Sequence, residues 1–278
     1  MKPAQFDYMR PERLEDAVAL LSEVDANAKV VAGGQSLGPM LNLRLARPGR
    51  LVDIRHVPEL RDVQADSKYF SIGATLTHAE IEDGAIEDFS GGLLPFVARG
   101  IAYRAVRNRG TIGGSLAHAD PAADWVSTMA AMGAAIIIRG PAGERRVPAQ
   151  QFLIGAFTSE VIATEILSAI ELPRLSPTVR WGYYKICRKT GEFAKAIGVT
   201  IQDAQLGLFR ILAGSTDGRP LLLARSAEVL ASRGPEQAAS QAREEIEETL
   251  THIGPGHRQQ LVVAVQRSLQ QIALKEAA

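Results

Sequence analysis

The sequence predicts an α+β protein: two small α/β units, followed by a region with an antiparallel sheet and helices. Three observations support this prediction. Residues 11–54 combine one helical stripe with two short apolar strands and a glycine-rich segment. A similar mixture returns over residues 69–173, and the rest of the chain shows strand patterns that lead into amphipathic helices. No internal repeat or low-complexity segment interrupts this order.

In the first unit, residues 6–8 are expected to be extended, and the spacing of apolar residues over 11–21 predicts a helix with Pro11 in its first turn. The apolar run 29–32 predicts a buried strand that ends in a glycine-rich segment, and 51–54 predicts a second strand. The stripe of the helix consists of Leu14, Ala17, Val18 and Leu21.

The second unit begins with a predicted strand over 69–74. Thr77 and Glu80 have the spacing of a capping box, which predicts a short helix. Asp120 and Pro121 resemble an N-cap and a first helical position, so a helix is expected from there to about Met132. The remaining predicted elements are a helix over 93–99, a strand over 134–139 with a turn at 140–143, and a strand over 165–172 stopped by Pro173.

The third region begins near Ser176. Residues 182–186, 197–201 and 206–212 have strand patterns that favour an antiparallel sheet. A further strand after Pro220 leads into helices. The last helix, from about His257, carries one apolar stripe made of Leu261, Val262, Val265, Leu269 and Ile272.

The composition fits a soluble protein of about two domains. The chain has 278 residues, is 46% hydrophobic, and balances 31 basic against 31 acidic residues. This neutrality gives no electrostatic reason to expect binding to nucleic acid or to an anionic membrane. No signal peptide opens the sequence and no apolar run is long enough to span a bilayer, so we expect a cytoplasmic chain.

The metal-binding residue types are scarce. Cys187 is the single cysteine, which excludes a disulfide framework and any cysteine-ligated zinc or iron–sulfur site within this chain. The five histidines show neither HxxxH nor HxH spacing. The sequence therefore predicts no metal site.

Two glycine-rich segments, 30–36 and 107–115, are the candidates for ligand binding. Neither is a GxGxxG fingerprint, and no Gly-Lys-Ser/Thr follows, so a Rossmann site and a P-loop are both unsupported. Successive backbone N–H groups in a glycine-rich turn suit a phosphate, and the hydroxyls of Ser36, Thr111 and Ser115 could add donors. Together the two segments predict one anionic ligand that is held from two sides.

Each feature also has a purely structural explanation when it is taken alone. A Gly-Gly pair is most often a tight turn or a close crossing of two backbones. Thr111 and Ser115 are typical turn or cap residues, and Asp124 is a favourable acid for a first helical turn. Taken alone, Lys29 and Lys185 would be surface residues, and Ile101, Leu167 and Phe193 would be core residues.

The motifs taken as an ordered set resemble the FAD-binding subunits of the molybdenum hydroxylases, the family of xanthine dehydrogenase and aerobic carbon monoxide dehydrogenase. The resemblance covers nearly the whole chain. It is carried by residues 31–37 with 43–45 and 51–54, then by 107–115 with 120–124, by 165–173, and by Lys185 with 188–194.

The resemblance implies a fold and a division into domains. An FAD-binding domain of the PCMH type would span residues 1–175, with α/β subdomains at about 1–57 and 58–175. A C-terminal flavoprotein domain, with a three-stranded antiparallel sheet and helices, would span 176–278.

The resemblance also implies which residues bind FAD. One set would wrap the pyrophosphate and ribitol: Lys29, Val30, Val31, Ala32, Gly33, Gly34, Gln35 and Ser36. Thr111, Gly114 and Ser115 would hold the pyrophosphate from the other side. The residues expected near the flavin or ribose are Ile101, Asp124, Leu167 and Lys185, with Phe193 over one flavin face and His118 near Ser115. Gly114→Val is then expected to abolish flavin retention while the fold survives.

By the same resemblance the chain would be the medium subunit of a heterotrimer that dimerises into a heterohexamer. A large subunit would carry the molybdopterin cofactor, and a small subunit would carry two [2Fe–2S] clusters that pass electrons to FAD and then to an external acceptor. Lys185 would stabilise negative charge on the reduced flavin. Two alternatives stay open: a stand-alone flavin oxidoreductase of related fold, and a flavin-free scaffold subunit. The sequence does not identify the hydroxylated substrate or the electron acceptor.

Overall fold

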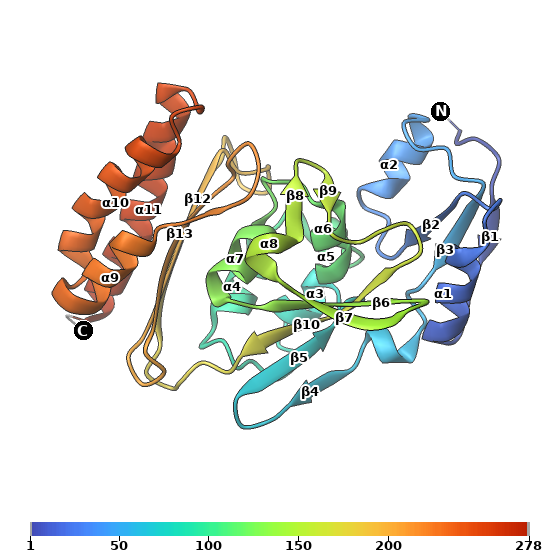
Figure 1. Ribbon diagram of the computed structural model, residues 1–278, viewed down its shortest axis with the longest axis horizontal. Coiled ribbons are helices and arrows are strands. Elements are labelled where there is room, and N and C mark those ends of the chain that lie inside the picture. Colours follow the sequence, from blue (N-terminus) through green and yellow to red (C-terminus); the bar gives the residue numbers. More distant parts are fainter. Residues whose placement is uncertain (1, 277–278) are drawn as a thin grey trace.

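The structure, a computed structural model, describes residues 2–276, and side chains up to residue 274. Figure 1 shows three parts that follow one another along the long axis, with the two termini near opposite ends. The N-terminal part contains a small parallel sheet, the central part a larger antiparallel sheet with helices, and the C-terminal part a second antiparallel sheet backed by long helices. This confirms the α+β class. Among the described residues no helix is both long enough and apolar enough to cross a bilayer.

The N-terminal sheet is entirely parallel, in the order β1-β3-β2. Helix α1 buries Leu14, Ala17 and Leu21 against this sheet, as its spacing predicts. Pro11 is not in its first turn: the helix begins only at Leu14, because Arg13 is still extended. The elements here are β1 (Asp7–Met9), α1 (Leu14–Ser22), β2 (Ala28–Val31), α2 (Leu37–Asn42), β3 (Arg50–Asp53) and the 3₁₀ turn η1 (Pro58–Leu60).

The prediction that residues 29–32 form a buried strand is only partly right. A strand forms at β2, but Lys29 is exposed and its neighbours are half-buried. The cause is its place in the sheet: β2 is an edge strand, whereas β3 is central and buries Leu51, Val52 and Asp53.

The central sheet has the order β4-β5-β10-β6-β7 and every neighbouring pair is antiparallel. Its strands are β4 (Val63–Ala65), β5 (Tyr69–Gly73), β6 (Ala135–Gly140), β7 (Gly143–Pro148) and β10 (Ile166–Pro173). The predicted turn at 140–143 closes the β6–β7 hairpin, and β10 runs through Pro173 itself. A separate small hairpin joins β8 (Leu153–Gly155) to β9 (Thr158–Ser159).

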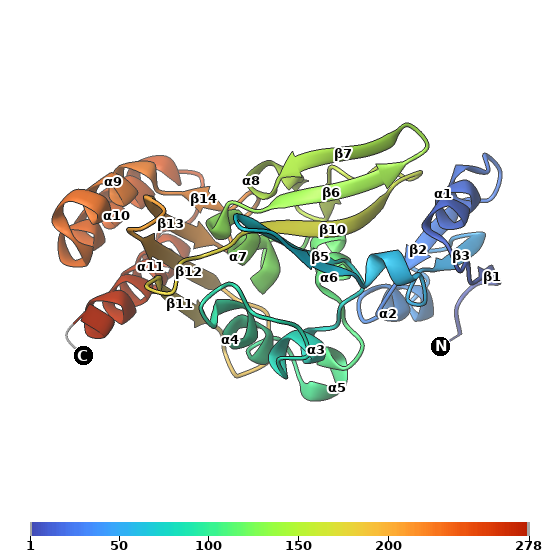
Figure 2. The same cartoon turned by 90° about the horizontal axis from the view of Figure 1, so that it is seen from below.

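Short helices lie beside this sheet; Figure 2 shows α6 and α7 next to it and α3, α4 and α5 farther out. The capping box of Thr77 and Glu80 is present at the start of α3, and α4 has the predicted bounds. The helices are α3 (His78–Glu82), α4 (Leu93–Arg99), α5 (Arg104–Arg107), α6 (Ile112–His118), α7 (Asp124–Met132) and α8 (Ala149–Phe152).

The predicted start of the helix that ends at Met132 is wrong by three residues. Helix α7 begins at Asp124, and its N-cap is Ala123. Asp120 instead begins a separate turn, in which its Oδ1 accepts the Ala122 N–H at 2.9 Å and its carbonyl accepts the Ala123 N–H at 3.0 Å. The Asp-Pro signal of a helix start is also the signal of a turn, and here the turn formed.

The C-terminal sheet is packed on both faces. Along β12, Ile197, Val199 and Ile201 join the core of the central part, whereas Ala196 joins a second core beneath the C-terminal helices. The sheet has four strands, because the two-residue β14 adds to the three strands that the resemblance implies. The elements are β11 (Arg180–Ile186), β12 (Ala196–Asp203), β13 (Leu208–Gly214), β14 (Leu221–Leu222), α9 (Ala224–Arg233), α10 (Pro235–Thr249) and α11 (Pro255–Glu276).

Candidate functional site

The first glycine segment leaves the N-terminal sheet at the carboxyl end of β2, beside the end of β3. Because the strands of this sheet are parallel, the loops that follow them meet at one edge, which is where open α/β sheets bind ligands. The chain turns sharply there, and Gly34 takes the left-handed conformation with φ of +70°. The Gln35 side chain closes the turn, since its Nε2 donates to the Gly33 carbonyl at 3.2 Å.

The backbone donors of this turn are unpaired. Within the described part of the chain, the N–H groups of Gly33, Gly34, Gln35 and Ser36 donate no hydrogen bond. Two carbonyl groups of the turn are paired: those of Gly34 and Ser36 accept hydrogen bonds from N–H groups in the first turn of α2. A run of unpaired N–H groups around a left-handed glycine makes a concave site for an anion. This segment therefore has the donors that a phosphate requires.

The second glycine segment is built differently, because it is the junction of α5 and α6. Thr111 is the N-cap of α6, and its Oγ1 accepts the Gly114 N–H at 3.0 Å. The N–H groups of Ile112 and Gly113 donate to carbonyls in the connection between β5 and α3, at 3.0 and 2.9 Å. These donors are thus consumed inside the protein and are not offered to a ligand.

The two segments touch each other through backbone atoms. A Cβ atom on Gly33 would lie 2.1 Å from the Arg109 carbonyl oxygen and 2.8 Å from the Cα of Gly110. A Cβ on Gly113 would lie 2.4 Å from the Ala74 Cβ and 2.7 Å from the Ala74 carbonyl oxygen. Both glycines are required for close approach, so part of each motif serves the packing of one segment on the next.

Gly114 is not crowded in the way that Gly33 and Gly113 are. It is exposed, and a Cβ atom on it would meet only the Thr111 Oγ1, at 2.7 Å. Ser115 beside it is half-buried, and its N–H donates to the Thr111 carbonyl at 3.0 Å. The start of α6 therefore presents a bare surface that a ligand can approach closely, although its N–H groups are paired.

A buried pair of rings, His78 and Trp125, is hydrogen-bonded to the second segment. The Trp125 Nε1 donates to the His78 Nδ1 at 3.0 Å, and the His78 backbone N–H donates to the Gly110 carbonyl at 2.9 Å. Burial, with a smaller effect of Arg107, lowers the pKa of His78 to about 4, so the ring is neutral near pH 7. Nothing in the sequence marks this pair except that His78 lies inside the capping box.

A second polar cluster lies where the central part meets β11. The Lys185 Nζ donates to the Asp124 Oδ1 at 2.7 Å and to the Gly100 carbonyl at 2.9 Å. The Tyr183 hydroxyl donates to the same carboxylate oxygen at 2.5 Å. Burial, together with the Asp124 charge, raises the pKa of Tyr183 well above its usual value, so the phenol stays protonated. The structure thus brings Asp124 and Lys185 together and adds Tyr183, which strand alternation alone could not mark.

The other predicted residues lie at several places. Ile101 follows Gly100 and so adjoins the Lys185 cluster, where its carbonyl accepts from Arg107 Nη1 at 3.0 Å. Leu167 is buried in β10 within the central core. The ring of His118 lies 5.3 Å from that of Phe157, at the far end of α6 from Thr111. Phe193 is 68% exposed on the segment between β11 and β12.

The chemistry that this arrangement offers is binding. The N–H groups at 33–36, which donate no hydrogen bond among the described residues, suit a phosphate, and Gly114 leaves an open surface at the start of α6. The Asp124 and Lys185 pair adds polar groups where the central part meets β11. These features fit the pyrophosphate of a dinucleotide such as FAD. In the part of the chain that the structure describes, no group of three or more His, Cys, Asp and Glu residues is placed to hold a metal ion.

Comparisons with known proteins agree with this interpretation. Residues 4–175 match a family described as the FAD binding domain in molybdopterin dehydrogenase. The medium chain of carbon monoxide dehydrogenase from Hydrogenophaga pseudoflava is 38% identical over 196 residues, which are 70% of this chain and 68% of that one. The medium subunit of nicotine 6-hydroxylase from Paenarthrobacter nicotinovorans is 31% identical over 262 residues, which are 92% and 91% of the two chains.

The solved structures extend the similarity to the whole fold. A chain in the crystal structure of quinoline 2-oxidoreductase from Pseudomonas putida 86 superimposes with a TM-score of 0.89 at 32% identity. The alignment covers 100% of both chains, so it includes the C-terminal sheet and helices that lie beyond the family match.

Proposed function

Because the chain belongs to the family of FAD-binding domains in molybdopterin dehydrogenases, we propose that it is the FAD-carrying medium subunit of a multi-subunit molybdenum hydroxylase. FAD is the cofactor of this family, and its members are oxidoreductase subunits. The observation that most supports the proposal is the run of N–H groups from Gly33 to Ser36 that donate no hydrogen bond within the described residues, in a segment that touches Arg109 and Gly110 just before α6.

We assign the pyrophosphate to these two segments. Residues 29–36 would wrap the pyrophosphate and ribitol, with the donors at Gly33 to Ser36 on the phosphate oxygens. Thr111, Gly114 and Ser115 would close the other side through the Thr111 hydroxyl and the open Gly114 face. In this proposal residues 1–175, with subdomains at about 1–57 and 58–175, form the FAD-binding domain, and residues 176–278 form the C-terminal flavoprotein domain.

We assign the flavin and the ribose to the residues that follow along the central part. Ile101, Asp124, Leu167 and Lys185 would lie near them, with Phe193 over one flavin face and His118 beside α6. Two of the three Lys185 N–H bonds already serve Asp124 and Gly100. The third would face the cofactor and stabilise negative charge when the flavin is reduced. If Lys185→Ala left both FAD retention and reoxidation unchanged, this role would be wrong.

FAD would supply the redox chemistry, namely acceptance of electrons from partner-bound centres and their transfer to an external acceptor. The chain's own residues bind the cofactor, orient it and set the polarity around it. A large subunit with the molybdopterin cofactor and a small subunit with two [2Fe–2S] clusters are the proposed partners, because one cysteine cannot ligate a cluster. We propose a cytoplasmic dimer of such heterotrimers.

The first test is FAD content. The purified wild-type protein should show flavin absorbance, and Gly114→Val should lose it while its circular dichroism is kept. The matched control is Gly256→Val, at a glycine in α11 whose Cβ would meet nothing within 4 Å. Absence of flavin from the wild-type chain after reconstitution with FAD would favour a scaffold subunit.

Co-purification tests the subunit assignment. Native protein isolated under gentle conditions should carry two partner chains, one with a molybdenum cofactor and one with iron–sulfur clusters. A chain that travels alone and turns over a substrate would instead be a stand-alone flavin oxidoreductase.

A further inference from the structure

A third polar group, the Tyr183 hydroxyl, contacts the buried ion pair of Asp124 and Lys185. The Asp124 Oδ1 accepts two hydrogen bonds, one from this hydroxyl at 2.5 Å and one from the Lys185 Nζ at 2.7 Å. The side chains of Asp124 and Lys185 are 9% and 11% exposed, and Tyr183 is buried. Two donors therefore share one carboxylate oxygen at a place where water screens their charges little.

The direction of the hydrogen bond from Tyr183 is fixed by chemistry. A carboxylate has no proton to donate, so the phenol is the donor. Burial, together with the Asp124 charge, raises the pKa of Tyr183, and the phenol therefore keeps its proton. The positive end of its O–H dipole points at the Asp124 oxygen and offsets part of the negative charge there.

The last helix of the chain holds Tyr183 in place. Strand β11 lies at the edge of its sheet, and the Tyr183 backbone N–H donates to the Gln271 Oε1 of α11 at 2.8 Å. Helix α11 lies directly on the strand, since a Cβ atom on Gly182 would be 1.9 Å from the Ser268 carbonyl oxygen. The C-terminal part therefore positions the hydroxyl, although Asp124 belongs to the central part.

The hydroxyl changes the electrostatic potential beside Lys185. Without it, one carboxylate and one ammonium group stand 2.7 Å apart, and their opposite charges largely cancel for any third group nearby. With it, part of the Asp124 charge is taken up by a second hydrogen bond, and the potential beside Lys185 becomes more positive. An anion placed next to Lys185 is therefore stabilised more when Tyr183 is present.

We propose that Tyr183 is a positioning residue that raises the reduction potential of bound FAD, by holding Asp124 and offsetting its charge beside Lys185. The proposal rests on the function proposed above, which places the flavin next to Lys185. An oxidised flavin ring is neutral, whereas a reduced one carries a negative charge near pH 7, so a more positive site favours the reduced form. The hydroxyl acts through Asp124 and Lys185 and requires no contact with the cofactor.

The test is the midpoint potential of FAD in the purified FAD-loaded complex, measured by spectroelectrochemical titration of the wild type and of Tyr183→Phe. Phenylalanine removes only the hydroxyl and keeps the edge-on contact with Phe96, whose ring centroid is 6.1 Å away. We expect reduced FAD to bind about tenfold less tightly relative to oxidised FAD, which for a two-electron couple is a potential lower by about 30 mV. Loss of a residue that merely packs the strand would leave the potential where it is.

The matched control is Tyr184→Phe. Tyr184 is the next residue of β11, and the alternation of side chains along a strand places it on the opposite face. Its hydroxyl makes no hydrogen bond to any residue that the structure describes. This substitution removes the same atom from the same strand, so it should leave the potential of FAD unchanged.

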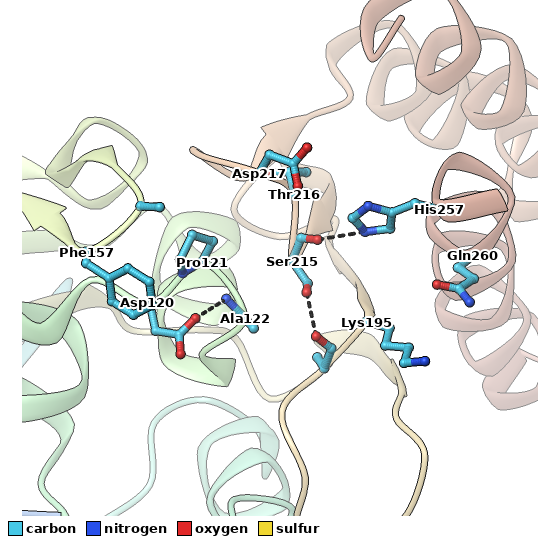
Figure 3. Close-up of a pocket in the computed structure, with 12 residues that line it drawn as sticks. Asp120, Pro121, Ala122, Phe157, Lys195, Ser215, Thr216, Asp217, His257 and Gln260 are labelled. Carbon is cyan, nitrogen blue, oxygen red and sulfur yellow. Dashed lines mark hydrogen bonds between the residues drawn. The ribbon is translucent and has the colours of Figure 1, made fainter. Parts of the chain in front are cut away.

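A second variant, Gln271→Leu, replaces Tyr183→Phe if that protein fails to fold or to retain FAD. Loss of the Oε1 acceptor frees the Tyr183 N–H and loosens the hold on its hydroxyl, so the potential should fall, by less than in Tyr183→Phe. Its control is Gln260→Leu on the same helix. Gln260 lies at a separate hollow of about 490 Å³, where Figure 3 shows it below His257, and its side chain makes no hydrogen bond within the described residues.

A potential that stays the same or rises when the Tyr183 hydroxyl is removed would overturn the inference, and so would an equal fall in Tyr184→Phe. Absence of FAD from the wild-type protein would contradict the proposed function instead. The potential is measured only on protein that contains FAD, and FAD content is measured first, so the two failures can be distinguished.

Discussion

The two glycine segments look alike in sequence, but their backbone N–H groups are paired differently in the structure. At Gly33–Ser36 the backbone N–H groups are unpaired and surround a left-handed glycine. At Thr111–Ser115 the N–H groups of Ile112, Gly113 and Gly114 are all paired within the protein, and Gly113 is packed against Ala74. The first segment thus has the free donors that the proposed phosphate site requires, and the second packs closely on the rest of the central part through backbone contacts.

The glycines of the proposed site therefore differ in what they do for the fold. Gly33 and Gly113 bring backbones together, Gly34 makes the turn, and Gly114 leaves a face open. Each role predicts its own response to a methyl group, so substitutions can separate packing from binding.

The largest effect is expected from Gly113→Ala. The added Cβ would lie 2.4 Å from the Ala74 Cβ and 2.7 Å from its carbonyl oxygen, and backbone cannot easily move aside. We expect the free energy of unfolding to fall by about 3 kcal/mol, measured by urea denaturation of the FAD-free chain. The matched change Gly114→Ala meets only one hydroxyl and should cost less than about 1 kcal/mol. Equal losses in the two variants would break the comparison.

Lowering the pH should reduce the free energy of unfolding, because His78 behind the second segment would become protonated on unfolding. Its pKa is about 4 in the folded protein, against about 6.5 in an unfolded chain, so the unfolded state binds more protons between these values. The contribution of neutral His78 is complete above pH 6.5 and declines as the pH falls, by about 2 kcal/mol at pH 5 and about 3 kcal/mol at pH 4.

The control for this prediction is His78→Asn, which keeps an acceptor for Trp125 but does not titrate. Urea denaturation at pH 7 and pH 5 should show a smaller loss of stability in the variant than in the wild type. Identical losses would mean that His78 is already protonated in the folded protein or is not buried.

A smaller effect on stability, but a clear one on binding, is expected from Gly34→Ala. Its Cβ would meet only the Val31 Cγ2 at 3.7 Å, so the cost is the left-handed backbone, about 1 kcal/mol. If the residue leaves that conformation, the donors of 33–36 no longer converge, and the Kd for FAD should rise at least tenfold, or about 1.4 kcal/mol. Gly84→Ala, at the same φ of +70° with open space around it, should match the loss of stability and leave FAD affinity unchanged.

Elements with a clear apolar pattern were predictable from sequence. The stripe from Leu261 to Ile272 is buried along α11, and α4 begins and ends where its pattern indicates. Those elements bury enough apolar surface for local pattern and tertiary packing to agree. The helices α5 and α6 were not predictable, because α5 buries none of its residues and α6 contains two adjacent glycines, so neither has an apolar stripe.

The components of the proposed site could be named from the sequence, but the contacts that each of them makes could not. The resemblance marked both glycine segments, Asp124 and Lys185, yet nothing local distinguishes a glycine that packs from one that binds. That distinction depends on Ala74 and Arg109, which only the fold brings close to Gly113 and Gly33. His78 and Tyr183 were missed for the same reason, since their partners Trp125 and Asp124 are 47 and 59 residues away.

Amide hydrogen exchange tests most directly whether the N–H groups of residues 33–36 bind the phosphates of FAD. The exchange rates are compared between the FAD-free and the FAD-loaded protein. The N–H groups of Gly33, Gly34, Gln35 and Ser36 donate no hydrogen bond within residues 2–276, so they should exchange fast without FAD and become strongly protected with it. Those of Ile112, Gly113 and Gly114 should already be protected and change little. If FAD protected the amides of 112–114 while those of 33–36 still exchanged fast, residues 33–36 would not be the phosphate site.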